Sequence, residues 1–266
     1  MTDAVEEAAR SVRRSPVARA LARGGYAANG VVHLVFGVVV IVISFGGRGE
    51  SDQAGVFKSL LEAPLGLLLV WILGLLLTAL GLFQALRAFL TKGRDASAWG
   101  RRGSAAGQSL VYLALGAIAI TVALGARPDG DRTAQEITRG LLDTPGGVFV
   151  VAAAGVGLVI GALVFASIGV RRSFDKQVRI PSGPMGTAVT VSGVLGYIGK
   201  GMSVLIVGIL LIVAAVKQDS AAAGGFDAAI EALLEQMIGP ALVFLVGLGL
   251  VVYAVFSFLR TRYAKL

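Results

Sequence analysis

Residues 65–83 read LGLLLVWILGLLLTALGLF, a run without a charged side chain. The hydrocarbon core of a bilayer is about 30 Å thick, and a helix of roughly 20 apolar residues spans it. We therefore predict a membrane-spanning helix here, extending to residue 89. Five other runs have the same character. The six predicted spans are residues 26–46, 65–89, 105–125, 147–170, 190–216 and 240–260.

The composition also indicates a membrane protein. Of the 266 residues, 56% are apolar and 15% are charged, whereas soluble domains average about 25% charged residues. The chain has no cysteine and one histidine, His33, which excludes disulfides and the common cysteine or multi-histidine metal sites. We expect no metal ion and no cofactor.

The distribution of basic residues predicts the orientation. The net charge of +8 does not indicate a nucleic-acid partner, because the basic residues lie at the ends of the spans rather than in one stripe. The two termini and the second and fourth connections carry 17 of them, and the other three connections carry six. By the positive-inside rule, both termini are cytoplasmic, and residues 1–20 form a basic cytoplasmic tail.

Three tandem helical hairpins account for the whole chain, with repeats at residues 21–92, 93–172 and 173–266. Small residues seven apart recur in each copy: Gly30/Gly37, Ser109/Gly116 and Gly201/Gly208 in the first helices, and Gly74/Gly81, Gly155/Ala162 and Gly247/Ala254 in the second helices. Seven residues are two helical turns, so each pair marks one face. Lipid provides no hydrophobic drive for helix association, and small residues allow close packing. We predict that these faces, and the pairs Gly103/Gly107 and Gly157/Gly161, pack helices together.

Tandem repeats of two spans all point the same way across a membrane. The expected fold is therefore all-α, a polytopic membrane protein with six transmembrane helices in a pseudo-threefold bundle. The three outer connections have apolar residues three and four apart, as in Val56, Phe57, Leu60 and Leu61, which predicts short amphipathic helices on the outer surface. They either close the outer ends of the spans or form a docking surface for an envelope partner.

The recurring pattern resembles the DUF1206 family of bacterial, largely actinobacterial, membrane proteins. The resemblance is carried by the helix start Tyr26–Gly30 and its copies, the acidic outer loops, and the arginines Arg87 and Arg260 at matching helix ends. It covers about residues 20–262. The family's copies often have a basic residue before the glycine; Lys200 keeps it, whereas Asn29 and Gln108 depart. The resemblance implies a bacterial cytoplasmic (inner) membrane protein and no particular activity.

Polar residues inside spans are costly and often functional. Asn29, Gln108 and Lys200 occupy equivalent positions near the cytoplasmic ends of the first helices. His33 lies one turn deeper than Asn29, and Gln84 one turn before Arg87. These five residues could form a pocket for an anionic ligand such as a lipid phosphate. Alternatively, Lys200 could extend to the lipid headgroups, Asn29 and Gln108 could hydrogen-bond between helices, and His33 could be a packed, hydrogen-bonded residue.

The sequence offers little for catalysis, since no acidic residue lies in a span and no Ser–His–acid arrangement is visible, so no catalytic residue is predicted. We expect a non-enzymatic membrane protein that acts as a scaffold or binds lipid or a partner, with membrane lipids and an envelope or membrane protein as candidate partners. The alternative is a small channel or transporter with a cytoplasmic vestibule.

Overall fold

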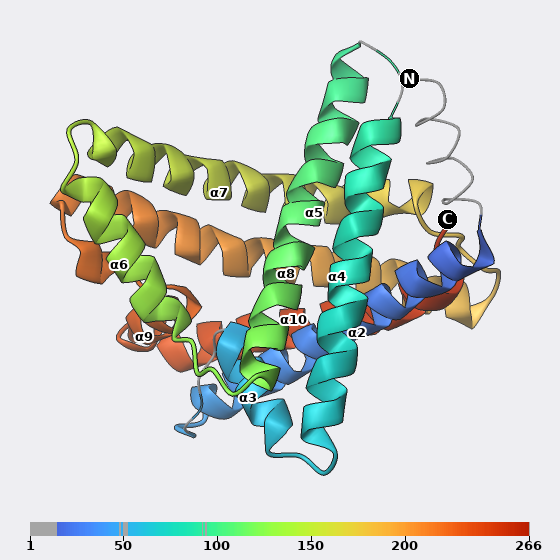
Figure 1. Ribbon diagram of the computed structural model, residues 1–266, viewed down its shortest axis with the longest axis horizontal. Helices are drawn as coiled ribbons and strands as arrows, with labels where there is room; N and C mark the ends of the chain where they lie inside the picture. Colours follow the sequence, from blue (N-terminus) through green and yellow to red (C-terminus); the bar gives the residue numbers. More distant parts are fainter. Residues whose placement is uncertain (1–14, 48, 50–52, 92, 94, 266) are drawn as a thin grey trace.

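The computed structural model describes residues 15–265 apart from 48, 50–52, 92 and 94 (Figure 1). Most of the predicted basic tail (residues 1–14) and the basic residues Arg48, Lys92 and Arg94 therefore lie outside the described residues. Within the described part, the chain is helical without a strand, and six helices are long and apolar enough to cross a membrane. The expected all-α, six-span architecture is confirmed.

The long helices follow the predicted spans closely at their outer ends. They are α2 (Pro16–Ser44), α4 (Gly66–Leu90), α5 (Ala96–Ala123), α7 (Gly147–Val170), α8 (Pro184–Lys217) and α10 (Gly239–Tyr263). The first long helix of each repeat begins earlier than the hydrophobic run predicts, as α5 does at Ala96 rather than near residue 105. The turns added to α2 and α5 carry arginines, so hydrophobicity does not detect them although they are helical.

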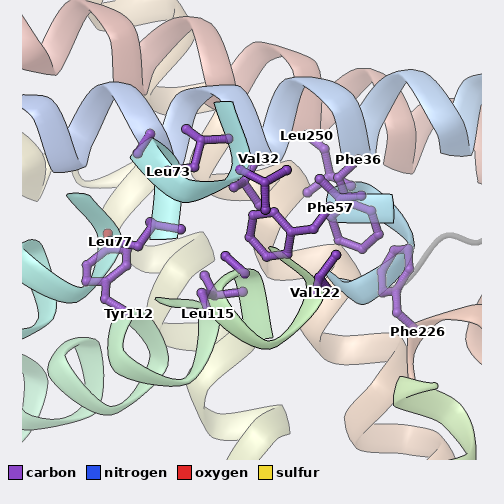
Figure 2. Close-up of a cluster of buried hydrophobic side chains, with 14 of the residues drawn as sticks. Val32, Phe36, Phe57, Leu73, Leu77, Tyr112, Leu115, Val122, Phe226 and Leu250 are labelled. Carbon is purple, nitrogen blue, oxygen red and sulfur yellow. The ribbon is translucent and has the colours of Figure 1, made fainter. Parts of the chain in front are cut away.

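A short helix joins the two long helices of each repeat: α3 (Gln53–Leu61), α6 (Gly130–Leu142) and α9 (Phe226–Leu234). Two of them bury apolar side chains in the main core. Phe57 of α3 and Phe226 of α9 are buried, and the Phe226 ring centroid lies 4.6 Å from that of Phe36 in α2 (Figure 2). By contrast, α6 leaves Ile137 60% exposed. The three amphipathic helices thus differ in how deeply they enter the bundle.

The most extensive packing joins neighbouring repeats rather than the two helices of one repeat. The second long helix of each repeat packs along the first long helix of the next, in the pairs α4–α5, α7–α8 and α10–α2. We call these three interfaces the seams. The last of them returns to the beginning of the chain, so the seams follow a cyclic, threefold order (Figure 1).

The predicted faces with small residues seven apart lie in the seams. The prediction for the pairs Gly103/Gly107 and Gly157/Gly161 was wrong, because a Cβ atom added at any of these four glycines would meet nothing within 4 Å. A Cβ atom added at Gly247 would lie 2.9 Å from the Gly37 carbonyl oxygen. The same contact recurs at 3.0 Å from Gly155 to Gly208 and at 3.1 Å from Gly116 to Gly74. A Cβ at any of the nine predicted packing glycines would come within 3.0 Å of an atom across a seam; these are Gly30, Gly37, Gly74, Gly81, Gly116, Gly155, Gly201, Gly208 and Gly247. Any side chain at these positions would therefore separate the helices.

The second repeat departs from the threefold order. The two long helices pack together within the first repeat (α2 and α4) and within the third (α8 and α10), whereas α5 and α7 do not pack along each other in the described chain. In Figure 1 the α4–α5 pair runs steeply across the other four long helices. Large core side chains, including Val32, Phe57 and Leu77, fill the space between this pair and α2 (Figure 2).

We predict that Gly208→Leu destabilises the folded protein by about 1–3 kcal/mol, the range for overpacked cores, because the Gly155 backbone cannot move aside. Detergent-denaturant unfolding would measure the loss. The matched control is Gly103→Leu, where an added side chain meets open space. Gly46 is unsuitable as a control because its φ of 82° disfavours any side chain. Equal stability of the two variants would contradict the role of the seam glycines.

Candidate functional site

Each seam carries one pair of side chains at an equivalent height, two to three turns from its close glycine contact. In the α10–α2 seam, Asn29 Nδ2 donates a hydrogen bond to Ser257 Oγ at 3.0 Å. In the α4–α5 seam, Gln84 Nε2 donates to Gln108 Oε1. In the α7–α8 seam, Lys200 Nζ lies 5.3 Å from the centre of the Phe165 ring. The equivalent residues Asn29, Gln108 and Lys200 thus belong to three different seams.

Asn29, His33 and Lys200 nevertheless lie in one region of the structure. His33 and Lys200 both contact the Tyr253 ring, and His33 also contacts the backbone of Asn29. Lys200 Nζ lies 4.4 Å from the centre of the Tyr253 ring, and the His33 ring centroid lies 4.8 Å from it on the α2 side. His33 Nδ1 is 2.8 Å from the backbone oxygen of Asn29, which requires the proton on Nδ1 if the two are hydrogen-bonded. Lys200 is partly buried and contacts rings of α7 and α10 rather than extending straight to the headgroups.

Arg260 lies two turns beyond Tyr253 on α10, and the sequence analysis used it only for the orientation and the family resemblance. Its side chain is 5% exposed, and its guanidinium carbon lies 4.3 Å from the centre of the Tyr26 ring. Nη2 donates to Gln177 Oε1 at 2.7 Å and, more weakly, to the Tyr26 hydroxyl at 3.4 Å. The available signal was its spacing: Arg260 follows Ser257 by one turn, just as Arg87 follows Gln84.

The connection between α7 and α8 covers the end of this group. Phe174 is buried and stacks on Tyr197 with centroids 5.9 Å apart, while Gly193 leaves room for its ring. The chain terminus is joined to the same connection: the backbone N–H of Arg179 donates to the Tyr263 carbonyl at 2.7 Å, and Lys265 Nζ donates to the Asp175 carbonyl at 2.8 Å. We call residues 171–183 the cap.

The cationic cluster, as we name Lys200, Arg260 and their neighbours Asn29, His33 and Tyr253, has an unbalanced charge. Neither Lys200 nor Arg260 has a carboxylate partner among the residues that the structure describes. Aromatic faces stabilise a cation by about 0.5–2 kcal/mol, less than the several kcal/mol that burying a charge costs. In the described chain, the buried atoms Arg260 Nε and Asn29 Oδ1 also lack hydrogen-bond partners. An anion would accept a hydrogen bond from Arg260 Nε, and an ordered water would donate one to Asn29 Oδ1.

Gln84 and Gln108 lie apart from this cluster, on the α4–α5 pair. Gln84 is fully buried and also accepts a hydrogen bond from Arg87 Nη1 at 2.9 Å. Gln108 Nε2 donates to Ser104 Oγ at 3.2 Å. The structure therefore gathers three of the five predicted site residues around Tyr253 and pairs the other two with each other.

At the opposite ends of the helices, a hollow of 230 Å³ lies between α3 and the end of α5. Its lining includes the basic residues Lys58 and Arg127 and the acidic residue Glu62. These residues belong to the first and third connections, and Glu62 offsets one of the two basic charges. The cationic cluster is therefore the stronger candidate for a binding site.

Comparison with known proteins supports the threefold organisation. The family described as Domain of Unknown Function (DUF1206) matches three segments, residues 24–91, 103–172 and 195–264. The chain is also 26% identical over 253 residues to an uncharacterized protein, YxxB, of Bacillus subtilis (strain 168), covering 93% of this chain and 92% of that protein. No solved structure matches.

We predict that Asn29→Ala and Ser257→Ala are coupled, because each removes the same interhelical hydrogen bond. Such bonds contribute about 0.6–2 kcal/mol in membrane proteins, and a double-mutant cycle on unfolding free energy would show coupling of that size. The control cycle joins Asn29→Ala with Ser109→Ala, which lies in another seam and donates to the Gly81 carbonyl. Additive effects in both cycles would refute the cross-seam pairing.

Proposed function

The chain belongs to the DUF1206 family, and we propose that it is a non-enzymatic membrane protein that binds an anionic group in its cationic cluster. The observation that carries the proposal is the enclosure of Lys200 and Arg260 by aromatic and amide side chains, without a carboxylate partner in the described chain. A buried cation without a counter-charge is costly. An anionic ligand would offset that cost on binding.

The chemistry of the cluster favours a phosphate-type anion. Lys200 and Arg260 supply the charge, and Arg260 Nε is a donor without a partner in the described residues. Lysine and arginine are the usual protein partners of phosphate groups. In a multi-pass membrane protein, the nearest abundant source of such a group is a phospholipid headgroup, and basic pockets between transmembrane helices bind such headgroups. A partner membrane or envelope protein could then assemble on the lipid-bound form.

A binding role also agrees with what the cluster lacks. Acid–base catalysis needs a group that exchanges protons near neutral pH beside a reacting atom. The cluster offers a lysine, an arginine, amides, phenols and a histidine whose Nδ1 faces a backbone carbonyl. These groups hold an anion more readily than they transform one.

We place the protein in the bacterial cytoplasmic membrane with both termini in the cytoplasm. The support is the excess of basic residues at that side of the spans, which includes Arg171, Arg172 and Lys176 of the cap. In this orientation the cationic cluster lies towards the cytoplasmic leaflet, the leaflet with the negative surface potential.

The orientation predicts which single cysteines react in intact cells. The chain has no native cysteine, so Lys176→Cys in the cap and Lys217→Cys at the other end of α8 each give one reporter. An impermeant thiol reagent should label residue 217 in intact cells and residue 176 only after the membrane is opened. Labelling in the reverse order would overturn the orientation. Position 94, which would report on the second connection, lies outside the described residues.

We predict that Lys200→Met stays folded but lowers the affinity for an anionic lipid about tenfold, because one charged contact is lost. A tenfold loss of affinity is about 1.4 kcal/mol of binding free energy. Lys200→Glu should lower the affinity further. The measurement is the shift in Tm of the detergent-purified protein on adding phosphatidylglycerol, with phosphatidylcholine as the neutral lipid and inorganic phosphate as the free anion.

The control is Lys217→Met, which removes the same charge from an exposed position on the same helix and should respond like the unaltered protein. A response to inorganic phosphate equal to the response to lipid would identify a soluble anion as the ligand. If Lys200→Met and Lys217→Met respond alike, Lys200 does not hold an anion and the proposal fails.

A further inference from the structure

The α5–α7 interface is the one place where a repeat leaves its two long helices unpacked in the described chain. Both helices carry glycines that face open space. A Cβ atom added at Gly107 of α5 or at Gly157 of α7 would meet nothing within 4 Å. In the α4–α5 and α7–α8 seams, by contrast, atoms of the facing helix occupy the space beside the glycines.

The third repeat shows what the same positions do when the helices pack. Gly116 and Gly155 correspond to Gly208 and Gly247, in both cases 92 residues further along the chain. With the same spacing, Gly107 corresponds to Gly199, and Gly157 to Gly249. These two counterparts are in backbone contact: a Cβ at Gly249 would lie 2.6 Å from the Gly199 Cα atom, where α8 crosses α10.

We propose that α5 and α7 close on each other in a second conformation, through contact of Gly107 with Gly157, and so complete the threefold ring of helices. The inference rests on the internal repeat and does not depend on the proposed anion binding. A glycine contact of this kind already exists in the chain, because the third repeat makes it at the equivalent positions.

One side-chain contact distinguishes the packed helices of the third repeat from the unpacked helices of the second. In the third repeat, Lys200 of α8 lies over the Tyr253 ring of α10 and holds the two helices together. The equivalents in the second repeat are Gln108 and Gly161, which cannot form a cation–π contact. The second repeat therefore has the glycines that allow close packing but lacks the cation–π contact that joins α8 to α10 in the third repeat.

The connection between the helices favours closure within one molecule. Short turns and the helix α6 join α5 to α7, as α9 joins the packed helices α8 and α10. Two segments joined this way meet at a high effective concentration. Closure would also alter the cationic cluster, because Phe165 of α7 contacts Lys200.

Disulfide formation in the cysteine-free chain tests the closed state. The double variant Gly107→Cys/Gly157→Cys should form an intramolecular disulfide on mild oxidation in native membranes, since a disulfide needs Cα atoms within about 7 Å. Ser104→Cys/Gly161→Cys, one turn away, tests the same face should the first pair prove too tight. Their counterparts, Gly196 and Tyr253, are in contact in the third repeat.

The negative control is Gly103→Cys/Leu163→Cys, at the same depth but on faces whose counterparts, Leu195 and Val255, are exposed. The positive control is Asn29→Cys/Ser257→Cys, whose native side chains meet at 3.0 Å. A disulfide within one chain in either test pair, absent from the negative control, supports closure. Bonds only between two chains, or none while the positive control reacts, would overturn it.

Stability gives a second readout that does not use oxidation. If only the open conformation exists, Gly107→Leu and Gly157→Leu meet open space and leave Tm unchanged or raise it. If the closed conformation contributes to the folded state, both should lower Tm by several degrees. Gly103→Leu is the matched control, because its third-repeat counterpart is already a leucine, Leu195. Equal Tm values for all three variants would contradict closure.

Discussion

Backbone-to-backbone contact at glycine is the constraint on which this structure depends. Inside a bilayer, helices gain nothing by hiding apolar side chains from lipid, so they associate only where they fit closely. Gly37 against Gly247, and its two equivalents, bring the helix axes near enough for carbonyl groups to approach the facing helix. Because these contacts join neighbouring repeats, each hairpin makes its most extensive interface with another repeat, and the three repeats are interdependent.

The close glycine contacts also determine what the polar residues can reach. Once the helices are close, the equivalent pairs Asn29–Ser257, Gln84–Gln108 and Lys200–Phe165 must face across their seams. In the first two pairs, the two side chains form a hydrogen bond with each other across the seam. Lys200 meets a phenylalanine instead, and so its charge extends to Tyr253 of α10. A single departure from the threefold pattern thus turns a packing position into part of a cationic cluster with Arg260.

The sequence was sufficient to predict the spans, the repeats and the glycine faces, because each depends on local composition or on a fixed period of seven. It could not predict which helices meet. A stripe of small residues shows that a face is packed but not what packs there, so the pairing of α4 with α5 was not foreseeable. For the same reason the five candidate site residues were grouped together, whereas Gln84 and Gln108 belong to another seam. Arg260 was counted among the basic residues at span ends, where a side chain usually reaches water, and its burial depends on the cap, Gln177 and Tyr26.

The most direct test of ligand binding is a cryo-EM map of the protein in a nanodisc of native lipids, enlarged by a rigid binding protein. We expect density that is not part of the chain, in contact with both Lys200 Nζ and the free Nε of Arg260, with the size of a phosphate group. A well-resolved cluster in which the aromatic rings close around both cations and no such density remains would contradict a ligand-binding role.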